Sequence, residues 1–509
     1  MPPRKSLVLA TVDCLRADHC GFMGYRRPTT PFLDRLASES FVVPTAIVAG
    51  VPTPYSFPAI LASRYPLDLG REVLGLAVEE PCLASTLKDD GYATAFFGAA
   101  NPYLSAQFGY DFGFDTFRDF LDTDLAPLSN SNNTSLEHDS WKSKLNRTLE
   151  VLGRKVPGMG AAYDELYFRY SQRSAARASM SFDTLRRFPA ANVIVDEAQT
   201  WLASVGENPF FLWLHFMDPH APYYPTEPGL EMLGENQLTA SQARYLNAYW
   251  NRPDIRKERL RRHRDEIIAL YDSGIRWVDT QLARLIETLR KFKLWDNCVF
   301  AFTGDHGEEF LEHGGRFHDP WLVEELIHVP LLLRVPGAEK KAVCSNPFSF
   351  LHLAPTLLAA AGSPIPSEFQ GQSHWTHIRD GRKWSEPAIA ECAAGPRSRF
   401  RPDYPGAVHL LAVRESRYKL VLNFNAHTGD LFDLEADPGE QNPLPNTEKK
   451  LERRRLFESA LTHLKRSASH RSSESYLRAR MRDIAANLIS SAPNVGTRAA
   501  GEATSSRLG

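Results

Sequence analysis

Residues 302–314 read F-T-G-D-H-G-E-E-F-L-E-H-G, and the interpretation of the whole chain starts from this stretch. It continues an apolar run, residues 298–302, that is typical of a buried strand. Asp305 and His306 follow the end of that strand. Side chains just past the carboxyl end of a strand in an α/β sheet lie where such folds bind ligands, and a carboxylate beside an imidazole can hold a divalent cation. The alternative is a polar turn that opens a helix, with Glu308 in its acidic first turn.

The composition is that of an ordinary globular protein. The chain has 509 residues, enough for more than one domain, and a net charge of −2, so no electrostatic argument favours nucleic acid or a membrane surface. No apolar stretch approaches the roughly 18 residues of a membrane span. The apolar run 7–12 ends at Asp13 without a cleavage pattern, which favours a first strand over a signal peptide. We therefore expect a cytoplasmic location, and we expect the six scattered cysteines to be buried free thiols.

Three more strand-like runs are each followed by a polar side chain that can bind a ligand. They are residues 6–12 with Asp13, residues 92–97 with Asn101, and residues 210–216 with His220. Each polar residue taken alone has a plainer explanation as a helix cap or a stacking group. Their recurrence at strand ends favours a shared site at the carboxyl edge of one sheet.

Residues 50–66 read G-V-P-T-P-Y-S-F-P-A-I-L-A-S-R-Y-P, and Thr53 and Ser56 stand where an apolar helix begins. A hydroxyl at a helix N-terminus is well placed for an anion or a metal, because the free N–H groups and the helix dipole stabilise negative charge there. A plain N-cap is the commoner role for such a residue. These residues alone leave both interpretations open.

The chain is predicted to divide into three parts. They are a large α/β domain over residues 1–385, a smaller α+β subdomain with an antiparallel sheet over residues 386–465, and a charged, disordered tail over residues 466–509. Within the first part, residues 122–189 change character and are predicted to be an inserted, variable segment with a helix near 164–173. This segment is interpreted either as a lid that selects substrate or as surface padding.

Several strings of the sequence match one family in the family's own order. They are T-V-D-C-L-R-A-D-H, P-T-T-P-F-L-D-R-L-A, P-T-P-Y-S-F-P-A-I-L-A-S-R-Y-P, L-H-F-M-D-P-H-A-P-Y, F-T-G-D-H-G-E-E-F-L-E-H-G, V-E-E-L-I-H-V-P-L-L-L, L-A-P-T-L-L-A-A-A-G and L-F-D-L-E-A-D-P-G-E-Q-N-P-L. The chain thus resembles the sulfatases of the alkaline phosphatase superfamily. The resemblance implies an α/β fold with a central, mostly parallel sheet sandwiched by helices, and a smaller C-terminal antiparallel sheet subdomain.

The resemblance also implies a role for each matching residue. The implied metal ligands are Asp13, Asp305 and His306, with the oxygen of Thr53 as an additional ligand. The implied catalytic residues are Thr53 as nucleophile, His220 as the acid for the leaving group, and His318 on the substrate's oxygens. The implied substrate-binding residues are Arg316, Asn101 and His313.

The sequence departs from the family pattern at three positions. Sulfatases proper use a cysteine, or sometimes a serine, that is converted to formylglycine and followed by x-P-x-R. Here Thr53 takes the nucleophile position, Phe57 replaces the arginine, and Cys14 stands where a second metal carboxylate often follows the first. The pattern is similar to that of relatives with an unmodified threonine, which include phosphodiesterases and phosphonate monoester hydrolases.

We therefore expect a metal-dependent hydrolase of sulfate or phosphate esters, with phosphorus esters favoured. The alternatives are a phosphotransferase that moves a phospho-alcohol group to an acceptor, and a catalytically silent, anion-binding family member. The expected cofactor is one divalent ion, Mn²⁺ or Ca²⁺ in the first place, with Zn²⁺ or Mg²⁺ also compatible. The expected partner is an anionic small-molecule or glycan ester, and no basic-aromatic platform for nucleic acid is evident.

Overall fold

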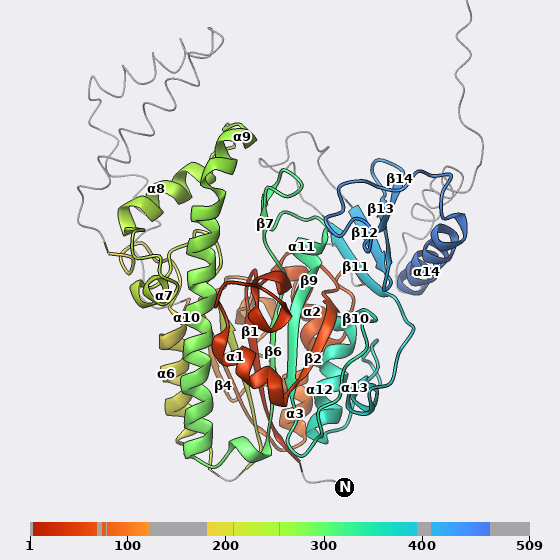
Figure 1. Ribbon diagram of the computed structural model, residues 1–509. Helices are drawn as coiled ribbons and strands as arrows, with labels where there is room; N and C mark the ends of the chain where they lie inside the picture. The colour runs from red at the N-terminus through yellow and green to blue at the C-terminus, as the bar shows by residue number, and fades with distance from the viewer. Residues whose placement is uncertain are drawn as a thin grey trace, which may run out of the picture.

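A computed structural model describes residues 4–68, 74–77, 79–121, 181–206, 208–253, 255–393 and 409–468 (Figure 1). Most of the expected insertion, residues 122–180 with the helix near 164–173, lies outside the described residues, as does the expected tail from residue 469. Among the helices of the described ranges, none is both long enough and apolar enough to cross a membrane.

A large mixed sheet forms the centre of the molecule. Its strand order is β10-β2-β9-β6-β1-β5-β3-β4. The bounds are β1 Ser6–Val12, β2 Phe41–Ile47, β3 Ala93–Gly98, β4 Thr116–Arg118, β5 Phe210–Phe216, β6 Cys298–Gly304, β9 His328–Arg334 and β10 Phe348–Ser349. Only β9 runs antiparallel to its neighbours, β2 and β6, and the other pairings in this sheet are parallel. The expected α/β fold with a mostly parallel central sheet is confirmed.

The central strands are apolar along their whole length because both faces of the sheet are covered. Every residue of β1 is buried. Leu7 and Leu9 face one hydrophobic core, whereas Val8, Ala10 and Val12 face a second core on the opposite side. This alternation follows from the two-residue period of a strand.

Helices cover both faces of the large sheet (Figure 1). The first core contains residues of α2 (Thr53–Ala62), α3 (Leu83–Asp89), α12 (Leu353–Ala361) and α13 (Trp375–Asp380). The second core contains residues of α1 (Pro31–Leu36), α6 (Ala191–Leu202), α8 (Ala240–Trp250) and α10 (Arg264–Lys291). The short helices α7 (Glu227–Met232) and α9 (Lys257–Leu260) lie in the chain before α10.

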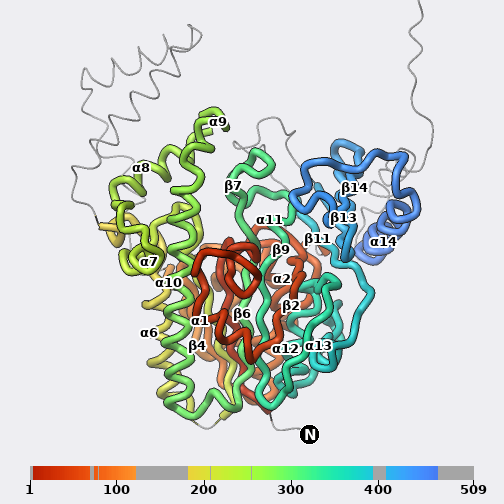
Figure 2. The backbone as a smooth tube through the Cα atoms, in the orientation of Figure 1, coloured from red at the N-terminus to blue at the C-terminus, as the bar shows by residue number. Residues whose placement is uncertain are grey.

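A smaller antiparallel sheet lies beside the large one, at the upper right of Figure 2. It consists of β11 (Ala388–Ala393), β12 (His409–Arg414), β13 (Tyr418–Asn423) and β14 (Thr428–Asp433), and α14 (Lys450–Ala468) packs against β12 and β13. The core of this unit also contains Ala59 of α2 and Leu351. The expected C-terminal antiparallel sheet is therefore present, and its core extends to the helix that begins at Thr53.

Two segments fold differently from their simplest interpretation. Residues 324–333 are rich in apolar side chains, which is typical of one strand, but they begin with the helical turn α11 (Glu324–Ile327) before β9 starts. The stretch after His306 forms a two-stranded hairpin, β7 (Glu309–Phe310) with β8 (Arg316–Phe317), and not the alternative helix start. The hairpin is closed by the carboxylate of Glu309, whose Oε1 accepts hydrogen bonds from the backbone N–H groups of His313 at 3.1 Å and Gly315 at 2.7 Å.

Candidate active site

The polar residues that follow the central strands meet at one edge of the sheet. In the sheet register, Val12 of β1 lies beside Phe216 of β5 on one side and Gly304 of β6 on the other. Asp13, the loop after β5 and Asp305 are therefore adjacent, as the expectation of a shared site requires. The N-terminus of α2 reaches the same place, because the hydroxyl of Thr53 lies 3.4 Å from Oδ2 of Asp13.

Asp13, Asp305 and His306 form a fully buried group of potential metal ligands. One ligand atom from each lies within 4.8 Å of the others. Oδ1 of Asp305 accepts backbone hydrogen bonds from His306 at 2.8 Å and Cys14 at 3.2 Å, whereas Oδ2 has no hydrogen-bond partner within the described residues. Two buried carboxylates beside an imidazole, with one carboxylate oxygen that has no hydrogen-bond partner within the described residues, fit the binding of a divalent cation.

Electrostatics at this group agree with a cation-binding role. Burial and the neighbouring Asp13 raise the pKa of Asp305 well above its usual value. Burial also raises the pKa of Asp13, but His220 and the other imidazoles around it outweigh burial, and the pKa lies well below its usual value. Burial lowers the pKa of His306 to about 3. His306 is therefore neutral, and because its Nδ1 can donate to the carbonyl of Gly307 at 2.9 Å, its Nε2 lone pair is left for a ligand.

Thr53 is the first residue of α2 and is buried. Its Oγ1 lies 3.0 Å from Nε2 of His306. The residue at the N-cap is Pro52, and the Thr53 hydroxyl makes no side-chain cap at this helix end. Ser56, one turn further on, donates to the carbonyl of Thr53 at 3.2 Å. Of the two interpretations that the sequence left open, this geometry favours a hydroxyl directed at the metal-ligand group.

Two further imidazoles border the group. The rings of His220 and His318 are 5.0 Å apart, centroid to centroid. Nδ1 of His220 contacts the carbonyl of Ala221, and its Nε2 lies 4.0 Å from Oδ1 of Asp13. Burial lowers the pKa of His220. Burial also acts to lower the pKa of His318, but the carboxylate of Glu308, 3.3 Å from Nδ1, outweighs it and raises that pKa. The two imidazoles thus differ in their preferred charge.

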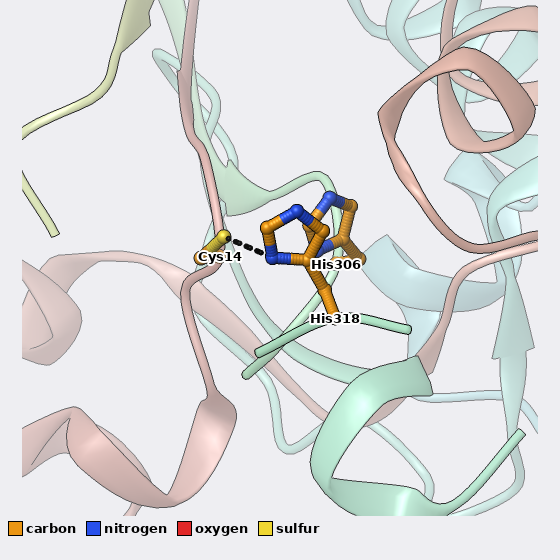
Figure 3. A group of neighbouring side chains, drawn as sticks. All are labelled: Cys14, His306 and His318. Atoms are coloured by element: carbon orange, nitrogen blue, oxygen red, sulfur yellow. Dashed lines mark hydrogen bonds between the residues drawn. The ribbon is translucent and has the colours of Figure 1, made fainter. Parts of the chain in front are cut away.

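Cys14 places a thiol in the same cluster (Figure 3). Its Sγ lies 3.0 Å from Oδ1 of Asp13 and 3.2 Å from Nδ1 of His318. The ring of His318 is 4.8 Å from that of His306, centroid to centroid. Burial, followed by the nearby carboxylate of Glu308, raises the pKa of this thiol well above its usual value.

The three residues expected to bind substrate are placed differently from one another. Asn101 lies in the cluster, but its Nδ2 donates to Oδ2 of Asp13 at 2.8 Å. Arg316 is buried, and its guanidinium donates to the backbone carbonyls of Trp250 and Arg252. Nε2 of His313 lies 3.0 Å from Oε2 of Glu325. These two residues and Glu440 form a separate group of potential metal ligands. The structure therefore brings Asn101 to the cluster, whereas Arg316 and His313 lie on the β7–β8 hairpin and have these partners outside the cluster.

Sequence reasoning missed two residues of the cluster. His215 lies inside β5, fully buried, with Nε2 3.4 Å from Oδ2 of Asp13 and Nδ1 3.0 Å from the hydroxyl of Thr11. Glu308, which only the alternative interpretation had singled out, as part of a helix's acidic first turn, is fully buried beside His318. A lone histidine near the end of an otherwise apolar strand was the available signal for His215. Asp218, on the same loop as His220, has a structural role, because it pairs with Arg186 at 2.9 Å.

A cavity of about 560 Å³ opens beside His318. It is lined by Arg187, Ala221, Pro222, Tyr224, Arg244, Asn247, Ala248, Asn251, Phe317, His318 and Asp319. The lining residues at 244, 247 and 248 share one face of α8, because they are spaced three and four apart, and residue 251 follows as the C-cap of this helix. Asn247 ties α8 to the loop after β5 through hydrogen bonds with the backbone N–H and C=O of Tyr223, at 2.7 and 2.9 Å.

Comparison with known proteins identifies the family. Residues 5–363 match the family model described as sulfatase, and residues 312–467 match the model described as the C-terminal region of N-sulphoglucosamine sulphohydrolase. The first match covers more than half of the chain, so the protein belongs to the sulfatase family. An ulvan-active sulfatase from Formosa agariphila is 24% identical over 455 residues, which make up 87% of this chain and 77% of that protein.

Solved structures share the fold over nearly the whole chain. The phosphonate monoester hydrolase of Agrobacterium radiobacter aligns with a TM-score of 0.61 and 19% identity, over 92% of this chain and 96% of that one. A protein solved with its substrate D-glucosamine-2-N,6-O-disulfate aligns with a TM-score of 0.59 and 17% identity, over 92% and 98%. These likenesses show the fold, and membership of the sulfatase family makes the protein an ester hydrolase.

Proposed function

We propose that the protein is a metal-dependent hydrolase of anionic esters in which unmodified Thr53 is the nucleophile and phosphorus esters are the preferred substrates. One observation carries this proposal. The Thr53 hydroxyl stands at the N-terminus of α2 and points at His306, within the group of potential metal ligands. A threonine cannot supply formylglycine by the route that sulfatases use, so the hydroxyl itself must attack.

The cation would be held by Asp13, Asp305 and His306, with the oxygen of Thr53 as a further ligand. When bound, a divalent cation lowers the pKa of a coordinated hydroxyl and neutralises charge on the ester oxygens. The unpartnered oxygen of Asp305 and the facing carboxylate of Asp13 support this assignment.

The reaction would proceed in two displacements. The hydroxyl proton of Thr53 passes to solvent, the oxygen attacks phosphorus or sulfur, and the bond to the leaving oxygen breaks as the new ester bond forms. His220 acts in its charged, imidazolium form, which the nearby carboxylate of Asp13 favours: Nδ1–H faces the carbonyl of Ala221, and the proton given to the leaving oxygen comes from Nε2. Water then displaces Thr53 and restores its hydroxyl. The carboxylate of Glu308 raises the pKa of His318 and so favours its cationic form. A cationic His318 is suited to stabilise the equatorial oxygens of the reacting ester.

The cavity beside His318 would receive the alcohol part of the ester. Two exposed arginines, Arg187 and Arg244, line it together with the aromatic rings of Tyr224 and Phe317. Aromatic faces and guanidinium groups suit a sugar that carries further negative charge. The relatives point the same way, since one is named for activity on ulvan and another is solved with a disulfated glucosamine. An anionic small-molecule or glycan ester is therefore the proposed substrate.

The proposal is tested with four model substrates: an aryl sulfate, an aryl phosphate, an aryl phosphodiester and an aryl phosphonate. Purified, metal-supplemented wild type is compared with Thr53→Ala, and with Ser56→Ala as the matched control on the same helix. We expect Thr53→Ala to lower turnover of the phosphorus esters by several orders of magnitude, while Ser56→Ala stays within about tenfold of wild type. Near-normal turnover by Thr53→Ala would remove Thr53 from the mechanism.

The same assay separates the remaining alternatives. Preferential sulfate cleavage that depends on Thr53 would show that an unmodified threonine performs sulfatase chemistry, and the preference for phosphorus esters would be wrong. Adding an acceptor alcohol and measuring the transferred product distinguishes a phosphotransferase from a hydrolase, because both share the covalent intermediate.

A further inference from the structure

Cys14 is held so that its side chain has one direction. The residue directly follows Asp13, and its φ of 60° lies in the left-handed region. Its N–H donates to Oδ1 of Asp305 at 3.2 Å, and its carbonyl accepts from the hydroxyl of Tyr271 at 2.7 Å. Since both backbone groups are fixed by buried partners, the thiol is directed into the cluster, as Figure 3 shows.

The thiol belongs to two groups of potential metal ligands. One consists of Cys14, His306 and His318, and the other of Cys14, Asp13 and His220, with ligand atoms within 4.8 Å of one another in each. These groups share His306 and Asp13 with the carboxylate group of the candidate active site. The sulfur is therefore a neighbour of the site where the cation would bind, and not part of a separate centre.

We propose that Cys14 is a thiolate ligand of the catalytic cation, and that the site therefore selects a borderline ion such as Zn²⁺ over Mg²⁺, Ca²⁺ and Mn²⁺. This inference rests on the cation site of the proposed function. Thiolate sulfur favours Zn²⁺ and similar ions, whereas all-oxygen sites favour the harder ones. This proposal departs from the expectation of Mn²⁺ or Ca²⁺. That expectation rested on carboxylates, an imidazole and a hydroxyl as the ligands and did not include sulfur.

A second observation points to a cation at the same place. Oδ2 of Asp305, which belongs to the group of Asp13, Asp305 and His306, is buried and has no hydrogen-bond partner within the described residues. Buried carboxylate oxygens without partners carry a large desolvation cost that a cation offsets. When the ion binds to sulfur, the thiol proton leaves to solvent. The surrounding carboxylates oppose a free thiolate because they repel its negative charge. The same carboxylates favour a thiolate bound to a cation, because they attract the positive ion.

The competing role for Cys14 is that of a thiol donating a hydrogen bond to Asp13. The distance of 3.0 Å from Sγ to Oδ1 fits this role as well. The two roles differ in whether sulfur bonds to the metal, which spectroscopy can read without any substrate.

The experiment uses the full-length protein loaded with Co²⁺ as the probe. A thiolate bound to Co²⁺ produces a sulfur-to-metal charge-transfer band in the near ultraviolet, separate from the visible ligand-field bands that report bound cobalt. We expect the charge-transfer band in wild type, in Thr53→Ala and in the control Cys344→Ser, and its loss in Cys14→Ser with the ligand-field bands retained. Ligand-field bands without the charge-transfer band in wild type, or no bound Co²⁺, would overturn the proposal.

Wild type alone decides the question if Cys14→Ser does not fold. Cys14→Asp is a second variant, since aspartate tolerates a positive φ better than most residues. In competition titrations of Zn²⁺ against Mn²⁺, we expect Cys14→Asp to lose on the order of tenfold or more of the Zn²⁺ preference. An unchanged preference overturns the proposal. Turnover of Thr53→Ala tests the proposed function separately, because this variant removes the hydroxyl and keeps the sulfur.

Discussion

His220 and His318 lie side by side but suit opposite tasks. His220 has a pKa lowered by burial, and Nδ1 is engaged with the carbonyl of Ala221. His318 faces the carboxylate of Glu308, which raises its pKa. A lowered pKa makes the charged form of His220 the stronger acid toward a leaving group, whereas a group that keeps its charge, as His318 does, suits anion binding.

The different roles of the two histidines predict different effects of their substitution. The effect of replacing His220 should depend on the leaving group of the ester, and the effect of replacing His318 should not. His220→Gln should slow hydrolysis of alkyl esters, which need a proton on the leaving oxygen, by about 10²–10⁴-fold. It should slow hydrolysis of nitrophenyl esters much less, because nitrophenolate departs without a proton. His318→Gln is the matched control and should slow both classes alike. The measurement is kcat/KM across a series of leaving groups, and equal losses for both classes in His220→Gln would exclude the acid role.

The sequence was informative about residues that directly follow strands. Asp13 and Asp305 follow β1 and β6, and parallel register alone makes them neighbours. Arg316 and His313 could not be placed this way, because they lie on the hairpin closed by Glu309. The geometry of this hairpin depends on hydrogen bonds from backbone N–H groups to the Glu309 carboxylate, which no spacing rule reveals.

At the scale of elements, α11 joins the large sheet to the small one through buried charges. Nζ of Lys419, which is fully buried on β13, lies 3.2 Å from Oε1 of Glu324 and 2.8 Å from Oε1 of Glu440. Arg414 of β12 adds a contact of 3.3 Å to Glu324. A buried cation between two carboxylates fixes how these elements meet, and breaking one pair leaves an uncompensated charge.

The Glu324 contacts predict an acid-dependent loss of stability. Burial raises the pKa of Glu324, but Lys419 and Arg414 outweigh it and lower the pKa to about 2. Because this lies below the unfolded value near 4.5, the stabilisation is complete above about pH 4.5 and is lost as the pH falls towards 2. The loss should be on the order of 3 kcal/mol. Urea unfolding between pH 3 and pH 7 measures the larger part of this loss, about 2 kcal/mol.

The matched variant is Glu324→Gln, which keeps the shape of the side chain and removes its charge. It should be less stable than wild type at pH 7, and the difference should shrink as the pH falls, while Glu440 and His328 continue to titrate in both proteins. A difference that stays constant with pH would show that the Glu324 charge is not the stabilising feature.

The direction of β9 shows where prediction of elements stops. The run from Leu326 to Leu333 is apolar in the sequence, and an apolar run carries no information about strand direction. Its antiparallel pairing with β2 and β6, and the helical turn at its start, depend on tertiary contacts. One such contact is the hydrogen bond of 2.9 Å from the N–H of Gly307 to the carbonyl of Leu326.

At the scale of the whole molecule, the small sheet supports the segment that carries Thr53. Gly50 forms an isolated bridge with Glu391 of β11, and the N–H of Glu391 donates to the carbonyl of Ala49 at 2.8 Å. Oε1 of Glu391 lies 2.6 Å from Nε2 of His463 on α14. The sequence predicted a second sheet, and we propose that the boundary of its subdomain lies near residue 385. The sequence offered no indication that this sheet contacts the chain just before Thr53.

Gly50→Ala should therefore reduce both stability and turnover. A Cβ at this position would come within 2.7 Å of the carbonyl oxygen of Tyr55 and 2.9 Å of that of Glu391, both backbone atoms that cannot rotate away. Overpacking of this kind costs about 1–3 kcal/mol. To relieve the clash, the segment at Gly50 must move away from Glu391, and this movement would shift Thr53.

The control is Gly439→Ala, whose Cβ would meet only the side chain of Gln441, at 3.9 Å. We expect Gly50→Ala to lower Tm and to lower kcat in the surviving folded protein, while Gly439→Ala changes neither. A variant with lower Tm but unchanged kcat would show that the small sheet stabilises the fold without positioning the nucleophile.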